Sequence, residues 1–470
     1  MNFTSDVVIG LEIHIGINTK SKLFCKCKND DAEPNTNVCP VCLGHPGAKP
    51  VVNIEAINKA LKLCLALKSK IANDVVFSRK AYFYPDLSKN YQTTQYELPI
   101  GDGGELELPN GNKVSLTRLH IEEDPASLVH VGGIADASYS FIDYNRSGTP
   151  LIELVTNPDM KSPEEARDFL RTLIGILNHL EIFDVKSGII KADANISIKE
   201  SGYVRAEVKN ISGFKEIEKA LNYEIERQRD AVKQGEKLRI ETRAWNSEDE
   251  TTSFMRSKES EADYGYIIDT DLVPIEVTKE MIEKAESEVG LIPIDFAKEI
   301  SSKYNLNFED CYIIANQKAF SDAYKKAIDI DAKLATNWFR HVIPTPFVKK
   351  YKDLEFVENI NEDEIIELFT LFKEKKVSDK VAKEILEKLV GEKFSPKEYI
   401  QENGLEMSSN TDEILIFAKE AISENPVAVE DFKNGESKSL NFLVGQVMKK
   451  SRGKANPGEA SKLIRKELNL

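Results

Sequence analysis

Apolar and polar side chains alternate over much of the first 275 residues, and this alternation predicts β-strands. The segment 7–17 places an apolar residue at every second position, with Glu12 and His14 on the opposite face. Three further segments, TRLHIEED, KADANISIK and YVRAEVKN, alternate in the same way and carry charged or amide side chains on their polar faces. The last two are separated by the turn-like ESG and are predicted to form a hairpin.

Two segments of this region have a helical period instead. Residues 162–180 begin with Ser162 as the N-cap and Pro163 in the first turn. Residues 214–233 keep apolar positions at helical spacing and stop before Gly235. We expect both helices to pack against the sheet.

From about Val277 onward, nearly the whole pattern is helical, with capping sequences at Ser395 and Asn456. The predicted fold class is therefore α+β: a mainly antiparallel sheet domain, then an all-helical domain and a small helical tail. The predicted domains are residues 1–290, 291–405 and 406–470.

Four cysteines follow the first strand as C-x-C and, after eleven intervening residues, C-x-x-C: Cys25, Cys27, Cys39 and Cys42. Two such pairs supply four thiolates for a closed tetrahedral Zn²⁺ site. A disulfide pair and a redox centre are the alternatives. Nothing in the sequence indicates secretion, and a C-x-x-C redox centre would not need the first pair, so zinc is the favoured interpretation. Four thiolates leave no open position, so the metal is expected to hold a loop.

The composition and charge of the chain argue against a membrane protein and against a DNA-binding protein. The 470 residues are 41% hydrophobic and 30% charged, with a net charge of −15. The start shows no signal peptide and no apolar run is long enough to span a membrane, so we expect a cytoplasmic protein that binds neither membranes nor DNA. From Asp431 onward, however, the chain contains nine Lys/Arg and only four Asp/Glu. This basic tail suits a folded RNA, and on charge alone a merely solvated tail fits equally well.

The polar strand faces together predict a site. Carboxylates with one imidazole suit Mg²⁺ or Mn²⁺, which bridge nucleotide phosphates to a reacting carboxylate. Neighbouring Lys and Arg would neutralise charge during phosphoryl transfer. For any single strand, exposed salt-bridged side chains explain the pattern better, whereas all the strands together favour a site. The sequence has no P-loop and no G-x-S-x-G or Ser-rich amidase signature.

Several segments of the sequence match those of a known family. Among them are GLEIHIGINTKSKLFC, CPVCLGHPGAKPVVN, FYPDLSKNYQTTQYELPI, HIEEDPA, DYNRSGTPLIELVTNPD, ADANISI, EVKNISGF and VGQVMKKSRGKANP. In these strings, and in their order, the chain resembles the B subunits of the tRNA-dependent amidotransferases that convert Glu-tRNA(Gln) or Asp-tRNA(Asn) to the amidated forms.

The resemblance implies a cradle-shaped domain of the glutamine-synthetase type that uses ATP and Mg²⁺ to phosphorylate the aminoacyl carboxylate. A partner amidase subunit would supply ammonia, and a small third subunit would complete a heterotrimer on misacylated tRNA. The implied catalytic residues are Glu12, His14, Glu122, Glu123, Asp193, Asn195, Glu207 and Lys209. The implied magnesium ligands are Glu12, His14 and Glu123. The residues implied near nucleotide or acceptor end are Tyr84, Ser88, Lys89, Ser197 and Arg205. The residues implied to contact tRNA are Lys449, Lys450, Arg452, Lys454, Lys462, Arg465 and Lys466. The cysteines match the zinc-bearing members.

One segment departs from the family. Residues 263–274 read DYGYIIDTDLVP where the family has close to DYRYFPDPDLP, so Gly265 stands in place of an arginine. The roles of three acidic residues of this segment therefore stay open: Asp263, Asp269 and Asp271. Two other functions compete with the leading one. A catalytically idle, zinc-stabilised tRNA-binding scaffold is the first. The related archaeal glutamyl-specific subunit is the second, although its extra inserted domain leaves it little room in 470 residues.

Overall fold

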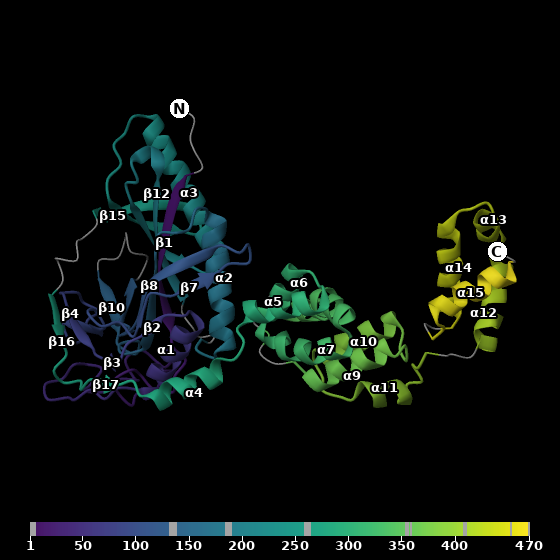
Figure 1. Ribbon diagram of the computed structural model, residues 1–470, viewed down its shortest axis with the longest axis horizontal. Helices are drawn as coiled ribbons and strands as arrows, with labels where there is room; N and C mark the ends of the chain where they lie inside the picture. The colour runs from purple at the N-terminus through teal and green to yellow at the C-terminus, as the bar shows by residue number, and fades with distance from the viewer. Residues whose placement is uncertain are drawn as a thin grey trace. The chain divides into compact units, whose positions relative to one another are not determined.

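The computed structural model describes residues 6–130, 139–183, 190–257, 265–352, 357, 360–407, 411–451 and 454–468 (Figure 1). The chain forms two compact units, residues 1–296 and residues 297–470, and each is described by itself. The first contains a large mixed sheet with helices, and the second is helical, which confirms the predicted succession of a sheet region and a helical region.

A ten-stranded sheet dominates the first unit. Its order is β15-β14-β13-β12-β1-β11-β8-β6-β2, with β7 paired to β8. The bounds are β1 Val7–Gly16, β2 Lys70–Ile71, β6 Gly101–Asp102, β7 Glu105–Glu107, β8 Lys113–Glu123, β11 Pro150–Thr156, β12 Ile190–Ile198, β13 Ala206–Ser212, β14 Glu241–Asn246 and β15 Thr251–Ser257. Within the described residues, the pairing of β13 with β14 is the one parallel pair in this sheet; the other pairs are antiparallel. The predicted hairpin of β12 and β13 is confirmed, with the short helix η1 Lys199–Ser201 between the strands.

The alternation along β1 sets which face of the sheet is buried. The apolar residues at alternate positions from Val7 to Ile15 are at most 3% exposed. Helix α2 (Pro163–His179) packs on β1, and α3 (Phe214–Lys233) packs on β12 and on α2. Both helices were predicted from the sequence. Ser162 caps α2 as predicted, by accepting a hydrogen bond from the Glu165 amide at 3.3 Å. Helices α1 (Ile54–Ala66) and α4 (Lys279–Val289) pack on each other, and α1 also contacts β8.

Three smaller sheets complete this unit. They are β4 (Ser78–Ala81) with β5 (Tyr91–Thr94) and β16 (Gly265–Ile268), β9 (Ser127–His130) with β10 (Ser140–Asp143), and β3 (Asp74–Val75) with β17 (Ile275–Glu276). The divergent segment thus supplies β16 and the turn after this strand. Asp269 is buried and accepts two hydrogen bonds from Arg79, at 2.9 and 3.0 Å, while Asp271 pairs with Arg79 and Lys49. Asp263 lies outside the described residues.

The second unit consists of helices. They run α5 Pro293–Tyr304 (which begins in the first unit), α6 Phe308–Ala315, α7 Lys318–Asn337, η3 Trp338–Val342, α8 Pro344–Tyr351, α9 Glu362–Lys373, α10 Asp379–Leu389, α11 Pro396–Glu402, α12 Thr411–Glu424, α13 Pro426–Lys433, α14 Ser437–Lys450 and α15 Pro457–Glu467. Ser395 and Asn456 cap α11 and α15 as predicted. The last four helices share a core that includes Ala418, Leu443 and Ile464. No helix in the part of the chain that the structure describes is long and apolar enough to cross a membrane.

Candidate functional site

Charged side chains from four adjacent strands meet on the sheet face opposite to the buried face of β1. Glu12 and His14 lie on β1, with Asp193 of β12 opposite Glu12. On the other side of β1, Glu153 of β11 stands opposite His14 and also opposite His120 of β8. Because strand neighbours stand about 5 Å apart, this register brings the charged groups within contact distance.

His14 is the centre of two groups of possible metal ligands. Its Nε2 lies 3.4 Å from Glu153, 3.6 Å from Glu122 and 3.9 Å from Glu12. One ligand atom from each of His14, Glu122 and Glu153 lies within 4.8 Å of the others, and the same holds for Glu12, His14 and Asp193. Oxygen-rich sets with one imidazole suit Mg²⁺ or Mn²⁺. The residues present therefore fit the predicted divalent metal.

The pKa values of this cluster follow from its excess of carboxylates. Burial and the neighbouring charge of Glu153 raise the pKa of Glu12 to about 7. Burial opposes protonation of His14, but its hydrogen bond with Glu153 and the charge of Glu122 outweigh burial and raise its pKa to about 10. Against the effect of its own burial, the charge of His120 and hydrogen bonds from both imidazoles hold the pKa of Glu153 well below its ordinary value. Without a metal, the negative charge of the cluster is therefore balanced by protons on groups such as His14. A bound cation would balance the same charge and displace these protons.

Glu207 and Lys209 of β13 extend the site across β12. Lys209 is ion-paired with Asp193, and its Nζ lies 3.8 Å from Glu207. The hydroxyl of Thr242 donates to the other oxygen of Glu207 at 2.9 Å. Asn195 pairs in register with Glu207 and lies on the same face. Four predicted residues are therefore adjacent here, although they come from two strands.

The remaining expected residues of this unit lie on β12, just before β13 and in the loop between β4 and β5. Ser197 is buried on β12, two positions beyond Asn195, whereas Arg205 is exposed just before β13. Tyr84 is exposed in the loop between β4 and β5. In the same loop, Lys89 is ion-paired with Glu123.

Glu123 belongs to neither group of possible metal ligands. Its carboxylate accepts hydrogen bonds from the Lys89 ammonium and, at 2.8 Å, from the Thr93 amide. Its neighbour Glu122 faces His14 instead, because successive residues of a strand point to opposite faces.

The four cysteines converge as predicted. Their sulfurs all lie within 4.8 Å of one another, and those of Cys39 and Cys42 are 3.8 Å apart. A tetrahedral Zn²⁺ with Zn–S bonds of about 2.3 Å requires sulfurs about 3.8 Å apart. A hydrogen bond from Cys25 lowers the pKa of the Cys42 thiol to about 5, with help from the buried Lys22 ammonium. The cluster therefore fits a structural zinc site.

The cysteine loop is packed directly on the strand-connecting loop that carries Lys89. The Cys42 carbonyl accepts hydrogen bonds from the hydroxyls of Ser88 at 2.7 Å and Ser147 at 3.1 Å. Gly44 has a φ of +68°, and a Cβ added to it would lie 2.6 Å from Cγ of Lys89. The position of the cysteine loop thus helps to set the position of Lys89.

Comparison with known proteins gives the family. Residues 7–283 match the GatB/GatE catalytic domain, and residues 318–468 match the GatB domain. The chain belongs to the GatB family. It is 41% identical to the B subunit of the aspartyl/glutamyl-tRNA(Asn/Gln) amidotransferase from Methanospirillum hungatei, over 99% of this chain and 98% of that protein. The B subunits of the amidotransferases from Clostridium acetobutylicum and Moorella thermoacetica are 40% and 39% identical, over 99% and 98% of this chain and 99% of each relative.

Two residues of this GatB site were not predicted from the sequence. Glu153 lies within the apolar string PLIELVT, and a lone acid inside a buried strand was its only signal. Thr242 precedes Arg243 in ETRAWN and gives no signal of its own, because a threonine is ordinary in a strand. His120 was visible on the polar face of its strand, and its Nε2 lies 3.4 Å from Glu153 and 3.6 Å from Glu122.

The basic residues of the GatB tail are divided between ion pairs and solvent. Lys450 bridges Glu420 at 3.0 Å and Glu424 at 2.7 Å, so its charge is used within the tail. Lys462 is exposed and pairs with Glu459 on its own helix. Three others are exposed on α14 and α15: Lys449, Arg465 and Lys466. Lys454 is half-buried between these helices, and Arg452 lies outside the described residues.

Proposed function

We propose that this chain is the subunit of a tRNA-dependent amidotransferase that activates the side-chain carboxylate of Asp-tRNA(Asn) or Glu-tRNA(Gln) by phosphorylation from ATP. The names of its relatives support the substrate class, and the GatB/GatE catalytic domain match supports an active subunit. The observation that carries the proposal is the meeting of Glu12, His14, Glu122, Glu153 and Asp193 on one face of the sheet.

The chemistry requires activation because a carboxylate cannot expel oxide when ammonia attacks. An acyl phosphate has a good leaving group, and ammonia then displaces phosphate to give the amide. This chain lacks an amidase signature, so ammonia comes from a partner amidase subunit, with a small third subunit completing a heterotrimer. The reaction belongs to the cytoplasm, where tRNA is charged.

Each side chain has a role in this scheme. Glu12, His14 and Asp193 would hold one divalent cation, and His14 with Glu122 and Glu153 a second position. When bound, Mg²⁺ or Mn²⁺ neutralises phosphate charge. Lys209, held by Asp193 and Glu207, places a positive charge beside the same carboxylates and favours charge developing on a transferred phosphoryl group.

The other expected residues take supporting roles. Lys89 is oriented by Glu123 and by the cysteine loop, with Ser88 joining the two loops, and Zn²⁺ on the four cysteines has a structural function. Tyr84, Ser197 and Arg205 would contact the nucleotide or the acceptor end. In the helical region, 291–405 and 406–470 act as separate domains. The exposed Lys449, Lys462, Arg465 and Lys466 of the tail hold the tRNA backbone. The sheet with its charged face is the cradle of a glutamine-synthetase-type domain.

The test is the complex assembled with the amidase and the small subunit, supplied with misacylated tRNA, ATP and glutamine. Amide formation and ADP release should appear together, with Asp-tRNA(Asn), Glu-tRNA(Gln) or both. Glu207→Ala should abolish both and leave glutaminase activity intact, whereas Glu226→Gln, an exposed change on α3, should leave all three activities unchanged.

Amide formation without ADP release would overturn the phosphorylation step. Undiminished amidation by Glu207→Ala would remove this residue from the site. The scaffold alternative predicts full amidation by Glu12→Ala and His14→Ala in a complex that still assembles.

A further inference from the structure

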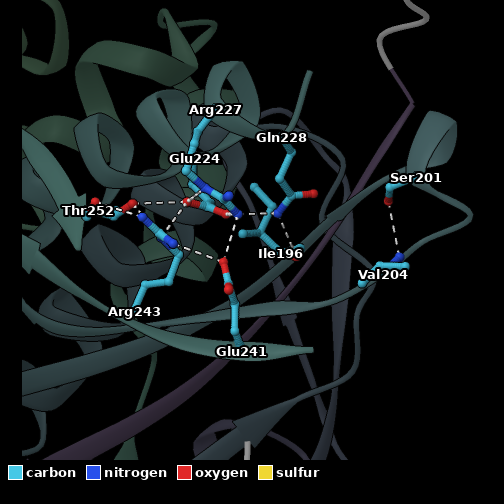
Figure 2. Close-up of polar contacts among 9 residues, drawn as sticks. All are labelled: Ile196, Ser201, Val204, Glu224, Arg227, Gln228, Glu241, Arg243 and Thr252. Carbon is cyan, nitrogen blue, oxygen red and sulfur yellow. Dashed lines mark hydrogen bonds and ion pairs between the residues drawn. The ribbon is translucent and has the colours of Figure 1, made fainter. Parts of the chain in front are cut away.

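A buried ionic network lies between α3 and the strands that it covers (Figure 2). Its centre is Glu224 of α3, which has no exposed surface. Arg227 donates to both Glu224 oxygens, at 2.6 and 2.9 Å, and the Thr252 hydroxyl donates at 3.1 Å. Arg243 of β14 lies 3.5 Å from the same carboxylate.

The network joins one helix to three strands. Arg243 donates to Glu241 on its own strand and to the hydroxyl and carbonyl of Thr252 on β15, each at 2.9 Å. The Gln228 amide donates to Glu224 at 3.0 Å and to the Ile196 carbonyl of β12 at 3.4 Å. In Figure 2 these side chains point toward one another between α3 and the strands.

The residue between Glu241 and Arg243 points the other way. Arg243 pairs in register with the buried Val208, while Thr242 pairs with Glu207 on the catalytic face. The Thr242 hydroxyl donates to the Glu207 carboxylate at 2.9 Å. Because β14 carries the network on one face and this hydroxyl on the other, a shift of β14 would displace both.

Stability alone does not account for such a network. Replacing a buried ion pair by well-packed apolar side chains is often neutral or stabilising, because desolvation of the charges offsets their attraction. A buried network of charged and hydrogen-bonded groups instead favours one arrangement of the elements it joins. Here the element specified is β14, which forms with β13 the one parallel pair within the described part of the large sheet.

We propose that Glu224 and Arg243 are positioning residues for the phosphoryl-transfer site: they fix β14 so that Thr242 holds the carboxylate of Glu207. This inference rests on the proposed function. It predicts that Glu224 acts on the reaction through Thr242, from the opposite face of β14.

A double-mutant cycle in the assembled complex tests this coupling. Glu224→Gln, Thr242→Val and the double variant are compared for kcat and for KM of ATP in amide formation, with glutaminase activity as the check on assembly. Losing a hydrogen bond to a charged group should lower kcat about tenfold in Thr242→Val. Glu224→Gln should also lower kcat in the wild-type background. In the Thr242→Val background, the same change should lower kcat by less than about twofold. Thr242→Ser, which retains the hydroxyl, should restore kcat, and Glu226→Gln on the same helix should match the wild type.

If the fold-losses of kcat in the two single variants multiply in the double variant, the inference is overturned. A Glu224→Gln protein with a lowered melting temperature and an unchanged kcat would also overturn it. If Glu224→Gln does not fold, Thr252→Val removes one donor to Glu224 and replaces it in the cycle. A wild-type complex that forms neither amide nor ADP would instead overturn the proposed function. An active wild type with multiplying effects would overturn only the positioning role.

Discussion

Replacing Glu153 by Gln would show how much the negative charge of Glu153, as distinct from its packing, stabilises the metal-free cluster. The amide has nearly the shape of the carboxylate, so the change removes the charge and leaves the volume. Glu153 is buried and lies 3.4 Å from the Nε2 atoms of both His14 and His120. We expect the first unit to lose stability at neutral pH and to keep it at high pH.

The magnitude follows from His120, whose side chain is 5% exposed. Burial opposes its protonation, but the charge of Glu153 and hydrogen bonds to Glu122 and Glu153 raise its pKa from 6.5 to about 9. Such a shift corresponds to about 3 kcal/mol of stability at full strength. Because the folded pKa is the higher one, this stability is present below pH 6.5 and is lost as the pH rises through 9. Since Glu122 remains, we expect Glu153→Gln to cost about 2 kcal/mol at pH 6–7 and little at pH 10.

The assay is urea unfolding of the full chain without added divalent ions, from pH 6 to pH 10. The chain has two tryptophans, Trp245 in the first unit and Trp338 in the second. In a Trp338→Phe background, indole fluorescence reports the first unit alone. Glu105→Gln is the control, because this partly exposed carboxylate pairs with two exposed lysines and such surface pairs contribute about 0–1 kcal/mol. An equal loss at pH 6 and pH 10 would refute the ionic explanation and assign the effect to packing.

Three further predictions concern metal and tRNA. Cys39→Ser should release about one zinc per chain, measured by metal analysis, and should lower amidation because the cysteine loop seats Lys89; an intact protein without zinc would contradict the structural site. Mn²⁺ affinity, followed by electron paramagnetic resonance, should rise with pH up to about 10 because His14 must lose its proton to bind, and a pH-independent affinity would argue against His14 as a ligand. Lys449→Ala and Arg465→Ala should each reduce the slope of log affinity for tRNA against log salt by about one unit, and an unchanged slope would place the tRNA elsewhere.

Local patterns in the sequence were enough to predict the elements. The apolar face of β1, the caps at Ser162 and Asn456 and the ends of α3 all depend on residues near one another in the chain. The convergence of the four cysteines was predictable for the same reason, since their spacing is local. The charged strand faces were also visible, so Glu12, His14, Asp193 and Glu207 could be named in advance.

The rest of the site depends on strand order, which local patterns do not contain. β1 lies between β11 and β12, which come more than a hundred residues after it in the chain. Only this order puts Glu153 opposite His14, and only the parallel pairing of β14 with β13 puts Thr242 on Glu207. The same limit applies to Glu122 and Glu123: their order in sequence says that they face opposite ways, but not which of them faces His14.

The cysteine loop contacts residues next to the proposed active site. From sequence, the cysteines were expected to hold a loop and to affect the chemistry little. The Cys42 carbonyl, however, accepts hydrogen bonds from Ser88 and Ser147, and Gly44 lies against the aliphatic chain of Lys89. That lysine is ion-paired with Glu123, whose neighbour Glu122 faces His14. A continuous series of contacts therefore runs from the four sulfurs to the proposed metal ligands. Loss of zinc should reach the active site through Lys89, and a side chain larger than glycine at position 44 should produce the same defect with zinc still bound.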